Sequence, residues 1–285
     1  MIRLALPSKG RLAEGARALL ERAGLELERN GERALQASLG GEFLALFVRA
    51  RDIPEFVADG AADVGITGGD LVAEAGRPVV TLLALGFGRC RLAVAAREDG
   101  NLGVLEELPA GARVATSFPR TTTRFFGERG LRVEVVPVSG AAEIAPLLGV
   151  ADVIVDLVST GSTLKVNGLR ELATVLESSA VLIARSAALE PAPRAIAELQ
   201  AALESVIRAY DKRYLMVNVP RTELEQVKRI LPGLNGPTII DILNGADHVA
   251  AHAVVERRDV YRTIAALKAI GGAGILVTEI ERLMP

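Results

Sequence analysis

The chain has 285 residues, half of them hydrophobic, so it is long enough for two or three domains with cores of their own. The formal net charge of -2, with no Lys/Arg stripe interleaved with aromatic residues, argues against a nucleic-acid partner. Cys90 is the single cysteine, which excludes an intrachain disulfide and fits a reducing cytoplasm. The apolar runs are short and broken by charges, so we expect a cytoplasmic protein without a membrane span or secretion signal.

The first two thirds of the chain alternate short aliphatic runs with segments of helical period, which is typical of α/β layers with largely parallel strands. The first block predicts strands at 2–7, 43–48 and 63–67 and helices at 10–24 and 52–58. The second block predicts strands at 91–95, 113–116, 133–137 and 153–157 and a helix that begins near Pro119. Each strand runs into a loop and then a helix.

A long amphipathic helix at 192–210 precedes a change of pattern, which places a domain boundary near residue 211. The tail predicts, in order, strand 214–219, helix 222–230, strands 238–243 and 249–256, helix 258–270 and strand 274–279. This βαββαβ order is the split βαβ, or ferredoxin-like, plan.

The most informative loop follows the buried strand 153–157. Four hydroxyl side chains surround one glycine in the run Ser159, Thr160, Gly161, Ser162 and Thr163. Hydroxyls, backbone N–H groups and the N-terminus of a following helix suit a phosphate, although the spacing is not that of a P-loop. An ordinary Ser/Thr turn is an equally good reading of the loop. Asp156 lies at the carboxyl end of the strand, where open α/β sheets bind ligands and where a carboxylate suits ribose hydroxyls or magnesium.

These residues carry a resemblance to a known family. Seven positions fall at the spacing of the ATP phosphoribosyltransferase signature: Glu143, Gly149, Asp156, Thr160, Gly161, Thr163 and Leu164. The segments LPSKGRL, DVGITGGDL and VATSFPR and the tail also resemble this family, so the likeness spans nearly the whole chain. The presence of the tail resembles the long, self-regulated form of the enzyme.

The resemblance implies two lobes like those of type II periplasmic binding proteins, followed by a ferredoxin-like or ACT-like regulatory domain. We expect lobe I at 1–88 plus about 180–210, lobe II at 89–179, and the regulatory domain at 211–285. It implies transfer of the phosphoribosyl group of phosphoribosyl pyrophosphate to N1 of ATP, the first step of histidine biosynthesis. It also implies Mg²⁺ bound through the substrate pyrophosphate, with Asp156 as a candidate ligand.

The same resemblance assigns the substrate residues. Phosphoribosyl pyrophosphate is expected at Glu143, Asp156, Ser159, Thr160, Gly161, Ser162 and Thr163. ATP is expected at Arg11, Arg49, Asp70, Thr116 and Ser117, and catalytic roles are expected for Lys9, Arg49 and Asp156. Lys9 and Arg11 follow the first strand, where a cationic pair suits the pyrophosphate leaving group.

Several of these residues also have a purely structural interpretation. Lys9 and Arg11 are also typical of solvent-exposed charges at the start of a helix. Arg51 is also typical of a solvent-exposed charge in a loop. Asp70 fits an N-cap slightly better than a cleft residue, and Thr116 and Ser117 fit a turn before Pro119. Cys90 reads as a small apolar filler.

In the tail, the resemblance implies histidine as an inhibitor, bound by Asn218, Thr238, Gly272 and Ala273. Some relatives carry an acid where this chain has Asn218. The family likeness also implies a homo-oligomer, from dimer to hexamer, without a separate regulatory subunit. His248 and His252 lack a third ligand nearby, so zinc is disfavoured. The alternative function is a non-catalytic two-lobed binding or sensor protein, since one fold serves many functions.

Overall fold

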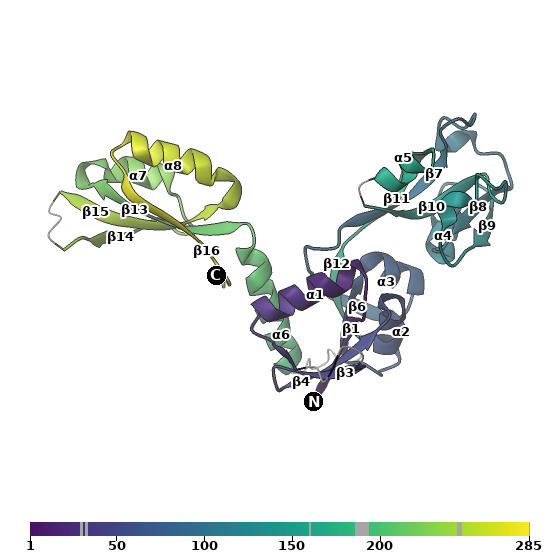
Figure 1. Cartoon of the computed structure of the whole chain (residues 1–285), viewed down its shortest axis with the longest axis horizontal. Helices are drawn as coiled ribbons and strands as arrows, with labels where there is room; N and C mark the ends of the chain where they lie inside the picture. The colour runs from purple at the N-terminus through teal and green to yellow at the C-terminus, as the bar shows by residue number, and fades with distance from the viewer. Residues whose placement is uncertain (29–30, 32–33, 160, 186–193, 244–246, 285) are drawn as a thin grey trace. The chain divides into compact units, whose positions relative to one another are not determined.

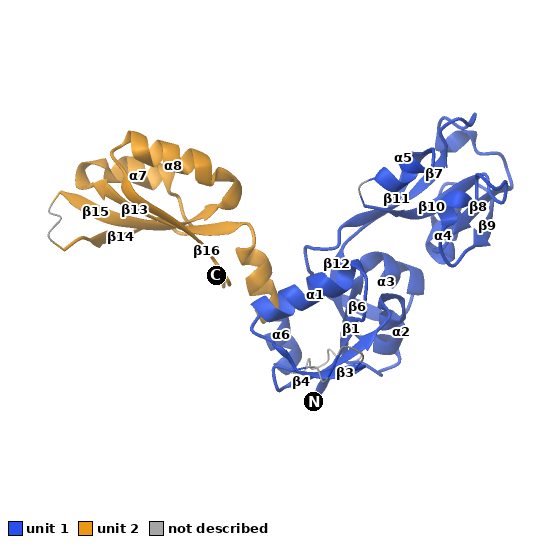
Figure 2. Cartoon of the chain, in the orientation of Figure 1, with its two compact units in different colours: residues 1–200 blue, residues 201–285 orange. Residues whose placement is uncertain are grey.

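The computed structural model describes the chain except residues 29–30, 32–33, 160, 186–193, 244–246 and 285. It forms two compact units, residues 1–200 and 201–285 (Figure 2). Helix α6 (Arg194–Ala209) begins in the first unit and ends in the second. None of the described helices has the length and apolar character needed to cross a membrane.

The first unit contains two sheets, each with its own helices, which we call lobe I and lobe II (Figure 1). Lobe I is built on a seven-stranded sheet of order β2-β3-β4-β1-β5-β12-β6. Its strands are β1 (Ile2–Pro7), β2 (Leu27–Glu28), β3 (Gln36–Leu39), β4 (Phe43–Val48), β5 (Val64–Gly68), β6 (Val79–Ala84) and β12 (Ala180–Arg185). Its helices are α1 (Arg11–Arg22), α2 (Ile53–Ala58) and α3 (Gly69–Ala75). The apolar face of α1, with Leu12, Ala16, Leu19 and Leu20, is buried as its 3.6-residue period predicts.

Lobe II is built on a five-stranded sheet of order β11-β7-β10-β8-β9. Its strands are β7 (Cys90–Arg97), β8 (Ala112–Thr116), β9 (Val133–Pro137), β10 (Val153–Val158) and β11 (Leu169–Ser178). Its helices are α4 (Pro119–Glu128) and the single turn α5 (Ser162–Val166), with a 3-10 turn at Ala142–Ile144. Apolar clusters cover both faces of this sheet, which explains why every residue of β10 except Asp156 is apolar.

The prediction of largely parallel strands is wrong. Among the described strands of the two lobes, six of the ten neighbouring pairs are antiparallel. The parallel pairs join β1 to β4 and β5, and β8 to β9 and β10. The antiparallel pairs arise because β7, β11 and β12 run between the lobes and enter each sheet from the opposite end, and because β2 and β3 form a meander that the sequence analysis did not identify. The predicted loops nevertheless follow the parallel strands, so their carboxyl ends remain grouped.

Two chain segments connect the lobes and lie side by side. The amide of Ala180 donates to the Phe87 carbonyl at 2.9 Å, and the amide of Leu85 donates to the Ala180 carbonyl at 2.9 Å. The amide of Gly69 donates to the Ser179 carbonyl at 2.9 Å, which ties the start of α3 to the second connection. Residues 85–90 and 178–180 therefore form a hydrogen-bonded junction between the lobes.

The second unit has the predicted βαββαβ order, with strand order β14-β15-β13-β16. Its elements are β13 (Lys212–Pro220), α7 (Leu224–Ile230), β14 (Thr238–Asp241), β15 (His248–Glu256), α8 (Val260–Ala269) and β16 (Ala273–Glu279). Helices α7 and α8 cover one face of this sheet, over a core that includes Leu215, Val217 and Leu267 (Figure 1). The two lobes and the ferredoxin-like tail that the resemblance implied are confirmed.

Candidate functional site

The carboxylates of Asp156 and Glu143 lie close enough to influence each other. Asp156 lies in the second half of β10, two residues before the strand ends at Val158, and Glu143 lies in the 3-10 turn at Ala142–Ile144. Burial raises the pKa of Asp156, the amide of Leu157 opposes this by donating to Oδ1 at 2.8 Å, and the charge of Glu143 raises the pKa further. Neither carboxylate is paired with a Lys or Arg within the described chain. Two acids without a counter-charge suit hydroxyl groups or a cation brought by a ligand.

The hydroxyl-rich loop follows directly. Ser159, Ser162 and Thr163 are exposed, and Thr160 lies outside the described residues. Gly161 has a φ of 80°, a left-handed conformation that favours glycine, and it precedes the first residue of α5. The expected helix after the loop is present but has only five residues, so its dipole adds little charge stabilisation.

Arg91 and Glu171 lie beside this loop, and the sequence analysis missed both. Arg91 pairs with Val158 across β7 and β10, and its Nε donates to both Glu171 oxygens at 3.1 and 2.9 Å. Nη2 donates to Glu171 Oε2 at 2.6 Å. The hydrogen bonds to Arg91 lower the pKa of Glu171, while burial opposes the shift. An isolated charged residue inside a strand gives no local sequence signal, so only the pairing of β7 with β10 reveals this position.

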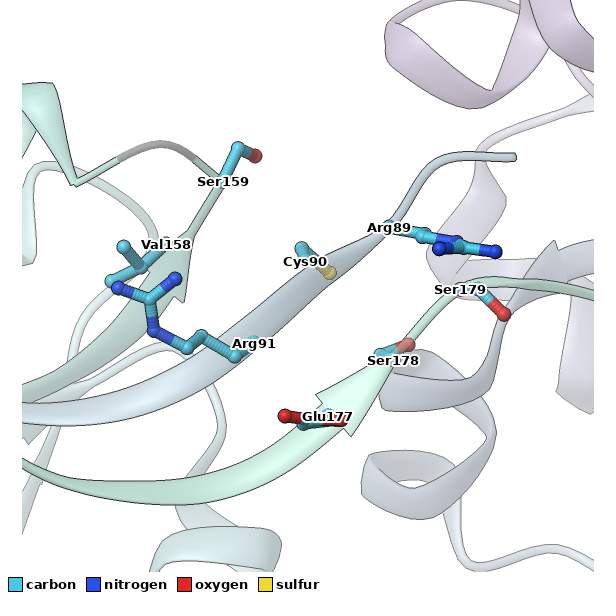
Figure 3. A pocket seen from close by; sticks show the side chains of 8 residues that line it. All are labelled: Arg89, Cys90, Arg91, Val158, Ser159, Glu177, Ser178 and Ser179. Carbon is cyan, nitrogen blue, oxygen red and sulfur yellow. The ribbon is translucent and has the colours of Figure 1, made fainter. Parts of the chain in front are cut away.

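A cavity of about 460 Å³ opens where the connections between the lobes meet this loop (Figure 3). Its lining residues lie at three strand ends and in the chain next to them: Arg89, Cys90 and Arg91 at the start of β7, Val158 and Ser159 at the end of β10, and Glu177, Ser178 and Ser179 at the end of β11. Figure 3 shows the Arg91 side chain directed towards the strand that carries Val158. Two arginines and three serines thus share one hollow with the carboxylate of Glu177, so cationic and hydroxyl groups are available to an anionic ligand there.

Lys9 and Arg49 lie at neighbouring strand ends in lobe I. Pro7 of β1 pairs with Val48 of β4 in parallel register, and the amide of Ser8 donates to the Val48 carbonyl at 2.8 Å. Lys9 and Arg49, the residues that follow, are exposed, and neither has an ion-pair partner among the described residues. Because parallel strands end at the same edge, two free cations meet there, as a pyrophosphate ligand would need.

Arg11 and Asp70 face the junction between the lobes. Arg11 Nη1 donates to the Gly88 carbonyl, and Nη2 donates to Cys90 Sγ at 3.1 Å and lies 3.8 Å from Asp70 Oδ2. The N-cap interpretation of Asp70 is wrong: Gly68 is the N-cap of α3, and the Asp70 carboxylate is 1% exposed. Its Oδ1 accepts from the Ser178 hydroxyl at 2.7 Å, and its amide donates to that hydroxyl at 2.8 Å. Both residues therefore hold the junction together.

Burial also raises the pKa of Cys90, and the charge of Asp70 adds to this effect. The thiol is buried, as a small core filler would be. Arg11 is its cationic neighbour.

Thr116 and Ser117 lie where α4 meets lobe I. Thr116 is fully buried, and its hydroxyl donates to the Val155 carbonyl at 2.7 Å and accepts from the Phe118 amide at 2.9 Å. Thr116 therefore forms the turn before Pro119 that the sequence offered beside an ATP contact. Its hydroxyl is hydrogen-bonded within lobe II. The Ser117 carbonyl accepts from Arg51 Nη2 at 2.9 Å, so the exposed Arg51 also has a hydrogen-bond partner in lobe II.

Glu74 of α3 supplies the cap that α4 lacks within its own lobe. Its two carboxylate oxygens accept from the amides of Arg120 and Thr121, both at 2.9 Å. A carboxylate at a helix N-terminus satisfies free N–H groups and the helix dipole. Glu74 and Arg51 thereby connect lobe I to lobe II.

The expected substrate residues do not all line one hollow. Ser159 lines the cavity at the junction, Lys9 a second hollow in lobe I beside Phe47, and Glu143 a third one beside Leu147 and Asn167. Among the described residues, no group of three His, Cys, Asp or Glu side chains has the arrangement of a metal site.

The four residues expected to bind the inhibitor histidine lie on two parts of the tail sheet. Asn218 of β13 pairs directly with Ala273 of β16, next to Gly272. Thr238 pairs with His252, which in turn pairs with Met216, so it is separated from Asn218 by β15. Both side chains are exposed on the face opposite the core residues Leu215 and Val217.

The family model for ATP phosphoribosyltransferase matches residues 49–205, and the model for its C-terminal domain matches residues 209–282. An ATP phosphoribosyltransferase from Gemmatimonas aurantiaca is 61% identical, and one from Natronomonas pharaonis is 49% identical, each over 100% of both chains.

A solved structure is similar as well. It is the ATP phosphoribosyl transferase (HisG:HisZ) complex from Thermotoga maritima, with a TM-score of 0.64 and 28% identity over 73% of this chain and 99% of that chain. The two family models together cover residues 49–205 and 209–282, and the relatives cover the full chain. The chain belongs to the ATP phosphoribosyltransferase family.

Proposed function

We propose that the chain transfers the phosphoribosyl group of phosphoribosyl pyrophosphate to N1 of ATP, which gives phosphoribosyl-ATP and pyrophosphate. Family membership along the full chain supports this activity. The structural observation that supports it best is the pair Glu143 and Asp156 next to Ser159–Thr163 at the carboxyl end of β10. The two acids suit the hydroxyl groups of a ribose phosphate, and the hydroxyl-rich loop suits its phosphate.

In this proposal the loop binds the 5-phosphate and the two acids accept hydrogen bonds from the ribose hydroxyls. The lone pair of adenine N1 forms a bond to ribose C1 while the bond from C1 to pyrophosphate breaks, and pyrophosphate leaves with the electron pair. Lys9 and Arg49 neutralise the charge that develops on this leaving group, and Arg49 also contacts ATP. Arg11, Asp70, Thr116 and Ser117 shape the ATP side of the site through the junction contacts described above.

Charge stabilisation and positioning supply the rate, without a covalent enzyme intermediate. Mg²⁺ would be held by the substrate pyrophosphate with Asp156 as a protein ligand, and it would supply positive charge for the leaving group. Glu143 and Asp156 keep the ribose oriented for in-line attack.

We further propose that histidine inhibits the enzyme by binding at Asn218, Thr238, Gly272 and Ala273. The tail supports a self-regulated form, because the Thermotoga maritima chain covers only 73% of this chain. No separate regulatory subunit is then required. We propose a cytoplasmic homo-oligomer, with lobe I at 1–88 and about 180–210, lobe II at 89–179 and the regulatory domain at 211–285.

Pyrophosphate release, measured with ATP and phosphoribosyl pyrophosphate each at saturation, tests the activity. Isothermal titration with each substrate separates catalysis from binding alone. Turnover that needs both substrates supports the enzyme, whereas tight binding of either one without pyrophosphate release supports the two-lobed sensor. Histidine added to the full chain in the same assay tests the regulatory proposal.

A further inference from the structure

The loop after β10 offers hydroxyls but no positive charge of its own at the phosphate end. Ser159, Ser162 and Thr163 are neutral, and a phosphate monoester carries a charge between about -1.5 and -2 at neutral pH. Burying such an ion without a counter-charge is costly. Lys9 and Arg49 belong to lobe I, at the ends of β1 and β4. A cation from lobe II beside the loop would supply charge that its hydroxyl and amide groups lack.

Arg91 occupies the required position. Arg91 lies opposite Val158 in the antiparallel pair of β7 and β10, and Val158 is the residue before Ser159. A Cβ atom built on Gly161 would lie 3.9 Å from Arg91 Nη2, so the guanidinium borders the loop backbone. Arg91 and Ser159 line the same cavity (Figure 3). The guanidinium thus approaches the loop from its neighbouring strand.

Glu171 fixes the direction of this guanidinium. It accepts from Nε at 3.1 and 2.9 Å and from Nη2 at 2.6 Å, while the Thr174 hydroxyl donates to its Oε1 at 3.0 Å. The side chains of Arg91 and Glu171 are 33% and 26% exposed, so the pair is shielded but accessible from the cavity. Nη1 has no hydrogen-bond partner among the described residues. One edge of the fork is bound and the other is available for an anion.

We infer that Arg91 binds the 5-phosphate of phosphoribosyl pyrophosphate from the β7 side of the loop, and that Glu171 acts as a positioning residue by holding the guanidinium. This inference rests on the proposed function. It adds a binding residue and a positioning residue to those the sequence indicated. The loop donates hydroxyl and amide hydrogens, and Arg91 supplies the charge.

The experiment uses two ligands that carry different ends of the substrate. Ribose 5-phosphate has only the 5-phosphate, and inorganic pyrophosphate represents the leaving group. In Arg91→Ala, we expect the affinity for ribose 5-phosphate to fall about 10- to 150-fold, the range for a hydrogen bond to a charged group. Affinity for pyrophosphate should stay unchanged, and the KM for phosphoribosyl pyrophosphate should rise more than kcat falls.

Glu171→Gln tests positioning by a double-mutant cycle. It should weaken ribose 5-phosphate binding less than Arg91→Ala does. The variant with both changes should bind no more weakly than Arg91→Ala alone, because Glu171 acts through Arg91. A merely structural role would give additive losses and would weaken pyrophosphate binding too. Arg113→Ala is the matched control, since it removes an arginine from β8 of the same lobe, and Arg113 does not line the cavity that contains Arg91 and Ser159.

Three results would overturn the inference: wild-type affinity for ribose 5-phosphate in Arg91→Ala, an equal loss of pyrophosphate affinity, or the loss appearing in Lys165→Ala instead. Lys165 is the exposed cation of α5 and hence the rival counter-charge. If the wild-type chain neither binds ribose 5-phosphate nor releases pyrophosphate, the proposed function itself fails. If it does both and Arg91→Ala behaves identically, only the role of Arg91 fails.

Discussion

Asp156→Asn tests whether the negative charge of Asp156 raises catalytic activity while it lowers the free energy of unfolding. The amide has the shape of the carboxylate, and its oxygen can still accept from the Leu157 amide, which donates to Asp156 Oδ1 at 2.8 Å. The substitution therefore removes the charge while keeping the local hydrogen bond. Because burial and Glu143 raise the pKa of Asp156, the charged form is disfavoured in the folded state.

The sign of the stability effect follows from that raised pKa. A folded-state pKa above the ordinary value of 3.8 means that the folded chain holds the proton more tightly. Asp156 thus stabilises the fold below its ordinary pKa, and this contribution is lost as the pH rises through the raised pKa. At neutral pH we expect Asp156→Asn to be more stable than the wild type. The difference should shrink as the pH falls towards the ordinary value.

The activity of Asp156→Asn should be lower than that of the wild type, although its stability at neutral pH is higher. If Asp156 accepts a hydrogen bond from a ribose hydroxyl, losing this charged acceptor costs about 1.5–3 kcal/mol, or about a 10- to 150-fold fall in kcat/KM. Urea unfolding across the acidic and neutral range gives the stability, and pyrophosphate release gives the activity. Glu143→Gln, which removes one cause of the raised pKa, should reduce the stability that Asp156→Asn adds. Full activity in Asp156→Asn, or a stability change that does not vary with pH, would refute this reasoning.

Three other outcomes are expected. Gly161→Leu forces a side chain into a left-handed conformation at a cost of about 1–2 kcal/mol, and with Thr163→Val it should raise the KM for phosphoribosyl pyrophosphate sharply; unchanged kinetics in both would count against the loop. Glu74→Ala removes the cap that lobe I provides for α4 and should lower the free energy of unfolding by about 1 kcal/mol in urea titrations, whereas wild-type stability would show that the cap is replaced by water. Asn218→Asp should lower the histidine concentration needed for half-inhibition, because a carboxylate pairs with the ammonium group better than an amide does; an unchanged value would place histidine elsewhere.

Patterns that are local in the chain determined much of this protein. The period of the apolar residues identified α1 and the βαββαβ order of the tail, since each helix or strand buries one face whatever lies opposite it. The hydroxyl-rich run after Asp156 was visible for the same reason. The likeness to the family also came from short runs of neighbouring residues.

Only the tertiary structure decided which distant residues meet. Arg91 and Glu171 are 80 positions apart, and Asp70 and Ser178 are 108 apart, so no spacing rule connects them. Strand direction was predicted wrongly from the sequence, because a strand such as β7 has the same local pattern whether it runs parallel or antiparallel to its neighbours. Burial of Thr116 depends on β10 lying beside β8, which leaves its hydroxyl bonded to the Val155 carbonyl. Local periodicity specifies elements, whereas the pairing of strands specifies the charges that surround a ligand.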